Sequence, residues 1–456
     1  MVAFEEVLHK LQILAVALFV AALIISIAKP LIKRQRRKKQ SMLIETSWSN
    51  RKGIVFGKNM LGRIVQSPAD KEGHVLVVGG SGSGKTSAIL IPTLQKICCN
   101  FFALDISGDI TAKVQRDDII VYNPLDPSTV PYDVFALIDS LGDEDERLEQ
   151  LEKLAFLIMP DSPNASEASH FFNSEGRRIL TAALLAFYSA GMDFVDICKK
   201  IISLPCVELF KEIDSQGSEI ASYLISSFRG TNEANTAGCK QAVDAAVKLF
   251  ALNSKISGSM RRPDDGEIAF YPTILERLNV IVRIPETMLD VYAPLLNIIV
   301  AQCLTYFASR EEGAKPNIFF ALDEFASLGK MDVLGALRRL RKRNVRVMLI
   351  IQSIADIELN YSEKERQVIV DNCMFKVILG VTDATSQEEF AKMIGHKKGQ
   401  KFSTTSGDSG SSYTKQEEDV WAVEPEKLSK LGNELILIHP AGYSRIKKAP
   451  YYKYEA

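Results

Sequence analysis

The chain has 456 residues, of which 46% are hydrophobic and 24% are charged, and its formal net charge is -1. This composition is that of a globular protein with room for two or three domains, and the overall charge gives no sign of nucleic-acid binding. The seven cysteines have no C-x-x-C spacing and no arrangement typical of a secreted disulfide framework, which favours a reducing cytosolic location.

The first predicted element is a membrane helix. An apolar run from Leu11 to Ala28 would span about 27 Å as a helix, the short end of what a bilayer core requires. Seven Lys and Arg residues, with no acid among them, follow within residues 29–39, whereas a signal peptide has its cations before the apolar region. We therefore predict a single-pass anchor in the inner membrane, with the basic block on anionic headgroups and the bulk of the chain in the cytoplasm. A buried core helix is the alternative.

A phosphate-binding loop comes after a predicted β-hairpin at residues 53–65. An apolar run from Val75 to Val78 predicts a buried strand, and residues 87–96 resemble a helix start. Between them is the complete G-x-x-x-x-G-K-[ST] pattern, Gly79-Gly80-Ser81-Gly82-Ser83-Gly84-Lys85-Thr86. Glycines let backbone N–H groups turn toward phosphate oxygens, Lys85 reaches the β- and γ-phosphates, and the Thr86 hydroxyl is placed to bind Mg²⁺. We predict a nucleotide site; a chance Gly/Ser-rich turn is the alternative.

Two further strand patterns indicate a parallel sheet. Residues 101–105 and 119–122 are apolar runs separated by helix-sized segments. The first run ends in Asp105, and the carboxyl ends of such strands face the ligand crevice. Asp105 is therefore a candidate for contact with the nucleotide or a neighbouring subunit, or a helix N-cap.

Helical periodicity replaces the strand patterns from Ala136 to about Arg262. We predict an all-helical domain at residues 136–265, inserted between two parts of a nucleotide-binding domain at 41–135 and 266–456, with residues 1–40 as the anchor. Residues 260–266 are the predicted return linker. Its two arginines, Arg261 and Arg262, suit an exposed polar turn or a phosphate contact.

A second catalytic signal follows the strand-like run at residues 318–322. This run ends in Asp323 and Glu324, the Walker B arrangement. Asp323 would hold Mg²⁺, directly or through water, and Glu324 would orient or deprotonate the attacking water. The alternative is that the two acids only cap the following helix.

A third signal is Gln352, which ends the apolar run that begins at Val345. Its amide could sense the γ-phosphate or position the water, and the alternative is that it satisfies backbone groups.

Four arginines precede this strand, namely Arg338, Arg339, Arg341 and Arg343. They could form a solvated helix face, supply an arginine finger to a neighbouring subunit's ATP, or contact nucleic-acid phosphates.

The late segment from Ser403 to Ser412 is rich in Ser, Thr and Gly. We expect it to be a mobile loop, either an inert linker or a segment that follows DNA near a central pore. Residues 435–438 predict one more strand.

The order of these motifs resembles the type IV secretion coupling proteins of bacterial conjugation (TraG-type). The most specific string is Leu322-Asp323-Glu324-Phe325-Ala326-Ser327-Leu328-Gly329, and Ile350-Ile351-Gln352-Ser353, Phe171-Phe172 and Ala449-Pro450-Tyr451-Tyr452 also match. The P-loop itself is not specific for the family.

The resemblance implies a membrane-anchored, RecA-like ATPase that uses ATP and Mg²⁺ and forms a homo-hexamer. Such a protein receives a relaxase, or another secreted protein, bound to single-stranded DNA and passes it to the type IV secretion channel. The helical insertion would recognise the cargo. Lys85 and Thr86 match the family's nucleotide-binding residues, Asp323 and Glu324 its hydrolytic pair, and Gln352 its sensing glutamine.

The chain departs from the family pattern in three places. Family members commonly have two membrane helices, and this chain has one candidate. The family often reads Asp-x-Lys-Gly-Glu after the second strand, where this chain has Asp105-Ile106-Ser107-Gly108-Asp109. No long acidic or disordered tail follows Tyr452.

Three other functions are compatible with the sequence. One is a hexameric double-stranded DNA translocase of the chromosome-segregation type, although no separate duplex-reading module is visible. Another is a receptor that binds ATP and recruits cargo without pumping. The third is secretion of protein effectors without DNA.

Overall fold

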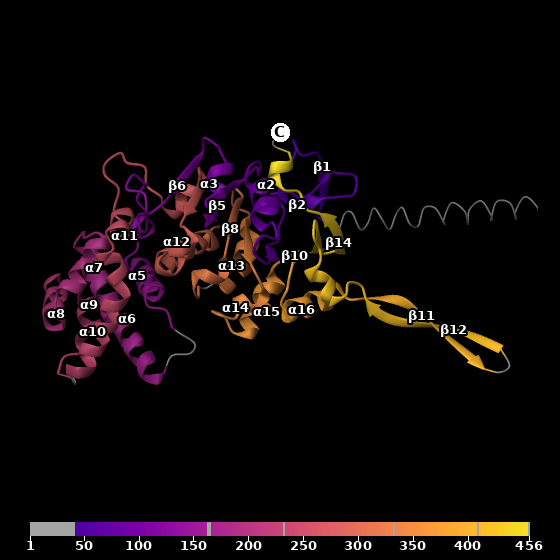
Figure 1. Ribbon diagram of the computed structural model, residues 1–456. Coiled ribbons are helices and arrows are strands. Elements are labelled where there is room, and N and C mark those ends of the chain that lie inside the picture. The colour runs from indigo at the N-terminus through magenta and orange to yellow at the C-terminus, as the bar shows by residue number, and fades with distance from the viewer. Residues whose placement is uncertain (1–41, 162–165, 231–232, 332, 408–409, 455–456) are drawn as a thin grey trace, which may run out of the picture.

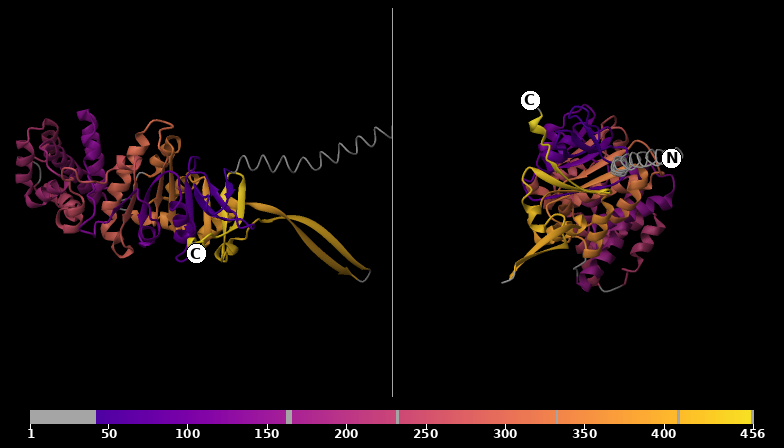
Figure 2. Two further views of the ribbon diagram at one scale, coloured as in Figure 1. Left: turned by 90° about the horizontal axis from the view of Figure 1, so that it is seen from above. Right: turned by 90° about the vertical axis from the view of Figure 1, so that its right-hand side faces the viewer.

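The computed structural model describes residues 42–161, 166–230, 233–331, 333–407 and 410–454. Figure 1 shows an elongated arrangement, with a group of helices at one end, a β-sheet in the middle and a two-stranded hairpin that projects from the other end. The views in Figure 2 show the same three parts in the same order. The predicted anchor from Leu11 to Ala28 and its basic block lie outside the described residues.

Twelve strands of the described chain form one mixed sheet. In their spatial order they are β1 (Ile44–Thr46), β3 (Ile64–Ser67), β2 (Ile54–Lys58), β14 (Gly442–Lys447), β13 (Glu434–His439), β10 (Phe375–Gly380), β4 (Val75–Gly79), β9 (Val345–Ile351), β8 (Ile318–Leu322), β5 (Asn100–Asp105), β7 (Asn279–Arg283) and β6 (Ile119–Tyr122). Neighbours from β10 to β6 are parallel, and the remaining pairs are antiparallel. The predicted α/β class is confirmed.

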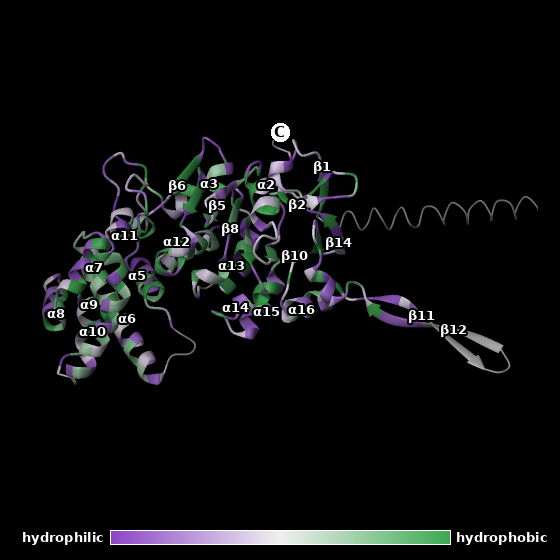
Figure 3. Cartoon of the chain, in the orientation of Figure 1, coloured by the Kyte–Doolittle hydropathy of each residue, from purple (hydrophilic) through white to green (hydrophobic). Residues whose placement is uncertain are grey.

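Both faces of the parallel strands are covered, which explains their nearly continuous apolar sequences. In β4, Val75 and Val77 pack with the P-loop helix and α3 (Asp109–Lys113), whereas Leu76 and Val78 belong to the cluster on the opposite face. The P-loop helix consists of η1 (Lys85–Leu90) and α2 (Ile91–Leu94). The hydropathy colours in Figure 3 show hydrophobic strands at the centre of the sheet.

The predicted run of helices between residues 136 and 262 is present. Its members are α4 (Ala136–Asp139), α5 (Glu144–Ile158), α6 (Glu167–Ser189), α7 (Phe194–Ser203), α8 (Cys206–Ser215), α9 (Glu219–Ser226), α10 (Glu233–Leu252) and α11 (Ser254–Ser259). The two ends of this helical run lie side by side. Tyr132 N, before the run, donates to Ser259 O at its end (2.7 Å), and Phe270 N, after the run, donates to Pro131 O (2.8 Å).

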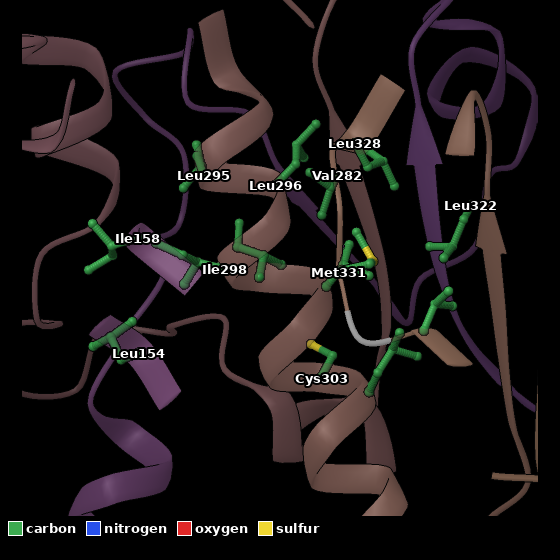
Figure 4. Packing of buried hydrophobic residues seen from close by; sticks show 14 of the residues in the cluster. Leu154, Ile158, Val282, Leu295, Leu296, Ile298, Cys303, Leu322, Leu328 and Met331 are labelled. Atoms are coloured by element: carbon green, nitrogen blue, oxygen red, sulfur yellow. The ribbon is translucent and has the colours of Figure 1, made fainter. Parts of the chain in front are cut away.

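Helix α12 (Leu289–Ser309) lies between the sheet and this helical part. Figure 4 shows its apolar side chains between Leu322 of β8 and Leu154 of α5. Within the described residues, the segment Glu286–Ser309 is the one stretch long and apolar enough to cross a membrane, and it is mostly buried inside the protein. We assign it to the core.

The second half of the chain contains further short helices. They are α13 (Val333–Leu340), α14 (Ile354–Ile357), α15 (Glu363–Asn372) and α16 (Ala384–Ile394), with single turns η2 (Pro272–Glu276), η3 (Glu286–Met288), η4 (Phe325–Leu328), η5 (Arg341–Arg343), η6 (Pro425–Ser429) and η7 (Tyr451–Lys453).

The antiparallel edge of the sheet was predicted in part. The hairpin expected at residues 53–65 is present as β2 and β3, and the strand expected at 435–438 is present as β13. Strands β1, β10 and β14 were not predicted. Strand β1 has only three residues and β14 is largely exposed, so neither has a strong apolar pattern.

The expectation of an irregular loop from Ser403 to Ser412 is wrong for the backbone that the structure describes. The segment belongs to the hairpin of β11 (His396–Gly407) and β12 (Gly410–Trp421), which pair in antiparallel register along their whole length. Threonine and aromatic residues favour extended backbone, and His396 stacks on Trp421 at the base with ring centroids 4.1 Å apart.

Candidate nucleotide-binding site

The P-loop has the backbone shape of a phosphate cradle. Gly82 and Gly84 have φ angles of 70° and 94°, in the left-handed region that favours glycine. A Cβ atom on Gly79 would lie 2.5 Å from Ser83 Oγ, so the loop closes on itself where no side chain fits. The Ser83 Oγ is buried and has no hydrogen-bond partner in the described structure. The loop is therefore folded tightly and keeps one polar atom unsatisfied.

Lys85 lies almost buried at the mouth of this loop. Its Nζ donates to Gly79 O (2.6 Å) and more weakly to Gly80 O (3.4 Å). In the absence of a ligand, these two carbonyl oxygens accept the hydrogen bonds that phosphate oxygens would accept in the complex. The predicted phosphate-binding lysine thus stands at the correct end of β4.

The helix that follows the loop is wide at its start. Ile91 N donates to Thr86 O, the i to i+5 bond of a π-helix, next to Pro92, which has no N–H to donate. The Thr93 Oγ1 donates to Ile89 O (2.6 Å) and accepts from Val55 N (3.0 Å). The second bond ties the P-loop helix to β2.

A cleft of about 360 Å³ opens over this loop at the carboxyl ends of the parallel strands. This volume is in the range of small-molecule sites. Its lining consists of Ser81, Gly82, Ser83, Gly84, Lys85, Thr86, Ser87, Ile106, Ser107, Asp109, Glu286, Asp323, Glu324 and Gln352. The structure therefore brings the predicted P-loop, the Walker B pair and Gln352 together in one cleft.

Asp323 is a buried carboxyl group at the floor of the cleft. Burial is the main cause that raises its pKa to about 7; the neighbouring Glu324 raises it further and Lys85 opposes the shift. Its Oδ1 accepts a hydrogen bond from Glu324 N (3.1 Å). At neutral pH this group is poised between its two protonation states.

Glu324 has an uncommon backbone conformation. Its φ and ψ angles of 47° and 44° are left-handed, which costs about 1–3 kcal/mol for a residue with a side chain. The conformation begins η4 and turns the carboxylate toward the cleft. There, Gln352 Nε2 lies 3.3 Å and 3.4 Å from the two carboxylate oxygens of Glu324.

The structure distinguishes between the two roles considered for Asp105. Its buried carboxylate accepts from Gly108 N (2.8 Å), Ile110 N (3.3 Å) and Thr111 N (2.7 Å), and from Thr111 Oγ1 (2.5 Å). Asp105 does not line the cleft. Asp105 holds the loop before α3, whose N-cap is Gly108, so its bonds favour the structural alternative. Contact of Asp105 with the nucleotide or a neighbouring subunit stays a prediction.

The four arginine-finger candidates lie away from this cleft in the same subunit. The arginines belong to α13 and η5, which directly precede β9. Because β9 is parallel to the P-loop strand β4, the arginines lie near the amino ends of the strands, opposite the P-loop. Arg341 pairs with Glu72 (2.8 Å), and Arg343 donates to Arg310 O (2.6 Å) and Arg339 O (3.0 Å). None of them lines the cleft within the described residues.

Outside the P-loop and its helix, three polar cleft residues were missed by the sequence analysis, namely Ser107, Asp109 and Glu286. Each follows the carboxyl end of a parallel strand, β5 or β7. The position of these residues just beyond strand ends was the signal that could have identified them.

The site residues fit a nucleotide with Mg²⁺. The glycine cradle leaves room for phosphates, Lys85 supplies a cation, and the Thr86 hydroxyl and Asp323 carboxylate are the oxygen ligands that Mg²⁺ prefers. Clusters of three or more His, Cys, Asp or Glu side chains able to hold a metal by themselves do not occur in the described part of the chain. Any Mg²⁺ here would depend on phosphate oxygens and water for the rest of its ligands.

Comparisons with known proteins agree with this geometry. The sequence model of the family described as Type IV secretory system Conjugative DNA transfer matches residues 26–456. Protein VirD4 of Rhizobium rhizogenes is 23% identical over 424 residues, which cover 88% of this chain and 62% of that protein. Conjugal transfer protein TraG of Rhizobium radiobacter is 23% identical over 310 residues, which cover 64% and 47%. The chain thus spans 62% or less of these relatives' lengths.

The fold is also similar to that of a solved protein. The structure of plasmid coupling protein TrwB in complex with ADP and Mg²⁺ has a TM-score of 0.65 and 20% sequence identity to this chain. The likeness covers 83% of this chain and 85% of that one.

Proposed function

The chain belongs to the type IV secretory system conjugative DNA transfer family, and we propose that it is a membrane-anchored ATPase that couples a relaxase bound to single-stranded DNA to a type IV secretion channel. The observation that carries the proposal is the single cleft that joins Lys85, Asp323, Glu324 and Gln352. A family relative, TrwB, has been solved with ADP and Mg²⁺ and with a non-hydrolysable ATP analogue.

Each residue has a defined task in hydrolysis. The P-loop N–H groups and Lys85 bind the phosphates and stabilise the charge that develops on them. Thr86 and Asp323 would hold Mg²⁺, which when bound neutralises charge on the phosphate oxygens. The Glu324 carboxylate orients the attacking water or accepts its proton, and the Gln352 amide holds that carboxylate and contacts the water.

The larger architecture follows from the same proposal. The strand order β10-β4-β9-β8-β5 suits a RecA-like core, and the run α4 to α11 suits an inserted cargo-recognition domain because its two ends meet at one edge of the sheet. In a homo-hexamer, the arginines of α13 and η5 would face a neighbouring subunit's ATP. Residues 11–28 anchor the assembly in the inner membrane.

A transfer assay tests the proposal. Donor cells that lack their own copy of the protein are complemented with the full chain, with Lys85→Ala or with Lys447→Ala, a control for an exposed lysine outside the cleft. We expect Lys85→Ala to abolish plasmid transfer although the protein remains in the membrane fraction and binds relaxase. Unchanged transfer would instead support a receptor that recruits cargo without pumping.

The nature of the DNA substrate is tested separately. The purified full chain in detergent should hydrolyse ATP faster with single-stranded than with double-stranded DNA. A preference for the duplex would favour the double-strand translocase.

A further inference from the structure

A lysine from the last residues of the described chain lies against the P-loop. The side chain of Lys448 passes over Gly84: its Cδ is 3.9 Å from the position that a Cβ atom on Gly84 would occupy. Ser87, whose Oγ is 3.6 Å from that same position, lines the nucleotide cleft, whereas Lys448 lies next to this part of the loop and outside the cleft lining of the free protein. Lys448 therefore stands at the end of the loop that leads into the P-loop helix, whereas Lys85 contacts carbonyls at its beginning.

The segment that carries Lys448 is fixed at several points. Lys448 N donates to Asn433 O (2.9 Å), and the next residue, Ala449, is fully buried. Farther on, Tyr454 stacks on Trp48 with ring centroids 4.0 Å apart. Figure 1 shows the C-terminal end of the chain beside α2 and β2. The backbone at Lys448 is thus held in place before any ligand arrives.

The ammonium group of Lys448 has no compensating anion among the described residues. The side chain is half-buried, and burial lowers its pKa. No carboxylate of the described chain forms an ion pair with it, unlike Arg445 nearby, which pairs with Glu434 (2.6 Å). A partly desolvated cation without a partner is costly for the free protein and favours the binding of an anion.

We propose that Lys448 is a second phosphate-binding lysine, which contacts the part of the nucleotide that ADP and ATP share. By the general P-loop pattern, the amides near Gly84 would cradle the α- and β-phosphates. Lys85, Glu324 and Gln352, which line the same cleft, would face the γ-phosphate. This inference rests on the proposed function and assigns to the C-terminal segment a role in nucleotide affinity. Contact with the shared phosphates changes affinity without changing the rate of the chemical step.

The test compares Lys448→Met, which keeps the aliphatic stem, with Lys447→Met, the neighbouring exposed lysine. Affinities of the full chain for ADP and for a non-hydrolysable ATP analogue are measured by calorimetry, together with kcat and KM for ATP. We expect Lys448→Met to weaken both affinities to the same extent, about tenfold, as for one charge-assisted hydrogen bond. KM should rise with unchanged kcat, and Lys447→Met should match the wild type.

Thermal unfolding separates this role from a structural one. If Lys448 serves binding, Lys448→Met leaves the Tm of the nucleotide-free protein unchanged or higher, and the increase in Tm on adding ADP becomes smaller. A lower Tm without nucleotide, together with an unchanged ADP affinity, would overturn the proposal. So would an affinity loss for the ATP analogue alone, or an equal loss in Lys447→Met.

The two proposals fail in different ways. A wild-type chain that binds no nucleotide would overturn both. Normal nucleotide affinity in Lys448→Met would overturn the role of Lys448 alone. The expected affinity loss in Lys448→Met, combined with plasmid transfer that does not depend on Lys85, would overturn only the coupling function.

Discussion

The Gln352 amide nitrogen lies 3.3 Å from the nearer carboxylate oxygen of Glu324, so the ends of two neighbouring strands are joined by a side-chain contact at the mouth of the cleft. Glu324 follows β8 and Gln352 follows β9, and these strands pair in parallel register. The contact holds the carboxylate in the cleft, where the proposed function requires it to act on a water molecule. Because both groups are accessible, the ligand can change this contact.

Loss of the Gln352 amide should slow hydrolysis and leave nucleotide binding nearly intact. In Gln352→Ala, the Glu324 carboxylate loses its orienting partner, so we expect kcat to fall about tenfold to a hundredfold with little change in KM. Steady-state phosphate release from the full chain measures both constants. Gln400→Ala, on the base of the β11–β12 hairpin, is the matched control. A change confined to KM would contradict the assigned role.

The raised pKa of Asp323 predicts a pH dependence for Mg²⁺. Because the pKa is about 7, the carboxyl group is protonated below neutral pH and must release its proton to bind the cation. In the presence of ADP, the Kd for Mg²⁺ should therefore increase by up to about tenfold per unit as the pH falls from 7 to 5. Calorimetry at a series of pH values measures it. Asp323→Asn should bind weakly and keep only the smaller pH dependence that comes from protonation of the ADP phosphate. A wild-type Kd with no steeper pH dependence than that of Asp323→Asn would refute the prediction.

The same pKa shift has a consequence for folding. The folded state holds a proton on Asp323 that the unfolded chain releases near pH 4, so this group makes the fold less stable as the pH rises from about 4 to 7. Asp323→Asn removes this effect. The free energy of unfolding of the variant minus that of the wild type should therefore be larger at pH 8 than at pH 4, which means that the variant gains relative stability at high pH. Urea unfolding at the two pH values measures the difference. An equal difference at both would contradict the assignment.

Two adjacent glycines of the P-loop should respond differently to alanine. In Gly79→Ala the new Cβ would lie 2.5 Å from Ser83 Oγ and 3.2 Å from the Cβ atoms of Ser83 and Leu379, so Ser83 must shift and nucleotide affinity should fall about tenfold. Gly80 has open space around the same position, and Gly80→Ala should bind within a few-fold of the wild type. A binding titration with a fluorescent ADP analogue compares them. Equal affinities of the two variants would show that the loop is not closed as described.

Asp105 should matter for stability more than for chemistry. Its carboxylate satisfies three backbone N–H groups and a hydroxyl, so Asp105→Ala should lower the free energy of unfolding by about 2–4 kcal/mol. Urea unfolding measures the loss. Asp109→Ala changes a nearby acid that lines the cleft and accepts no bond of this kind, and it should unfold like the wild type. If Asp105→Ala had normal stability but no nucleotide binding, the assignment as a cap would be wrong.

The parts of the site that lie close together in sequence were predictable. The P-loop and the pair Asp323–Glu324 are short motifs, and the residue types and spacing within each motif indicate its chemistry. The alternatives for Asp105 needed the structure, because the donors that decide its role are backbone N–H groups of the next turn. The position of Arg341 relative to the cleft could not be predicted without the strand order, because it is the parallel pairing of β9 with β4 that puts the start of β9 opposite the P-loop.

Long-range packing explains the remaining differences. Lys448 is separated from Gly84 by most of the chain, and no local pattern links the two. Strand β10 was missed although it pairs with the P-loop strand, because its apolar run resembles a buried helix segment as much as a strand. The hairpin from His396 to Trp421 was missed because its polar composition outweighed its strand propensity.

The most direct test of the account uses Glu324→Gln, which keeps the shape of the side chain and removes its charge. ATP binding, phosphate release and plasmid transfer are measured for this variant and the wild type. The account predicts ATP affinity within a few-fold of the wild type, phosphate release reduced at least a hundredfold, and loss of transfer. Plasmid transfer at the wild-type frequency by cells that carry Glu324→Gln would contradict the central claim that hydrolysis in this cleft drives transport.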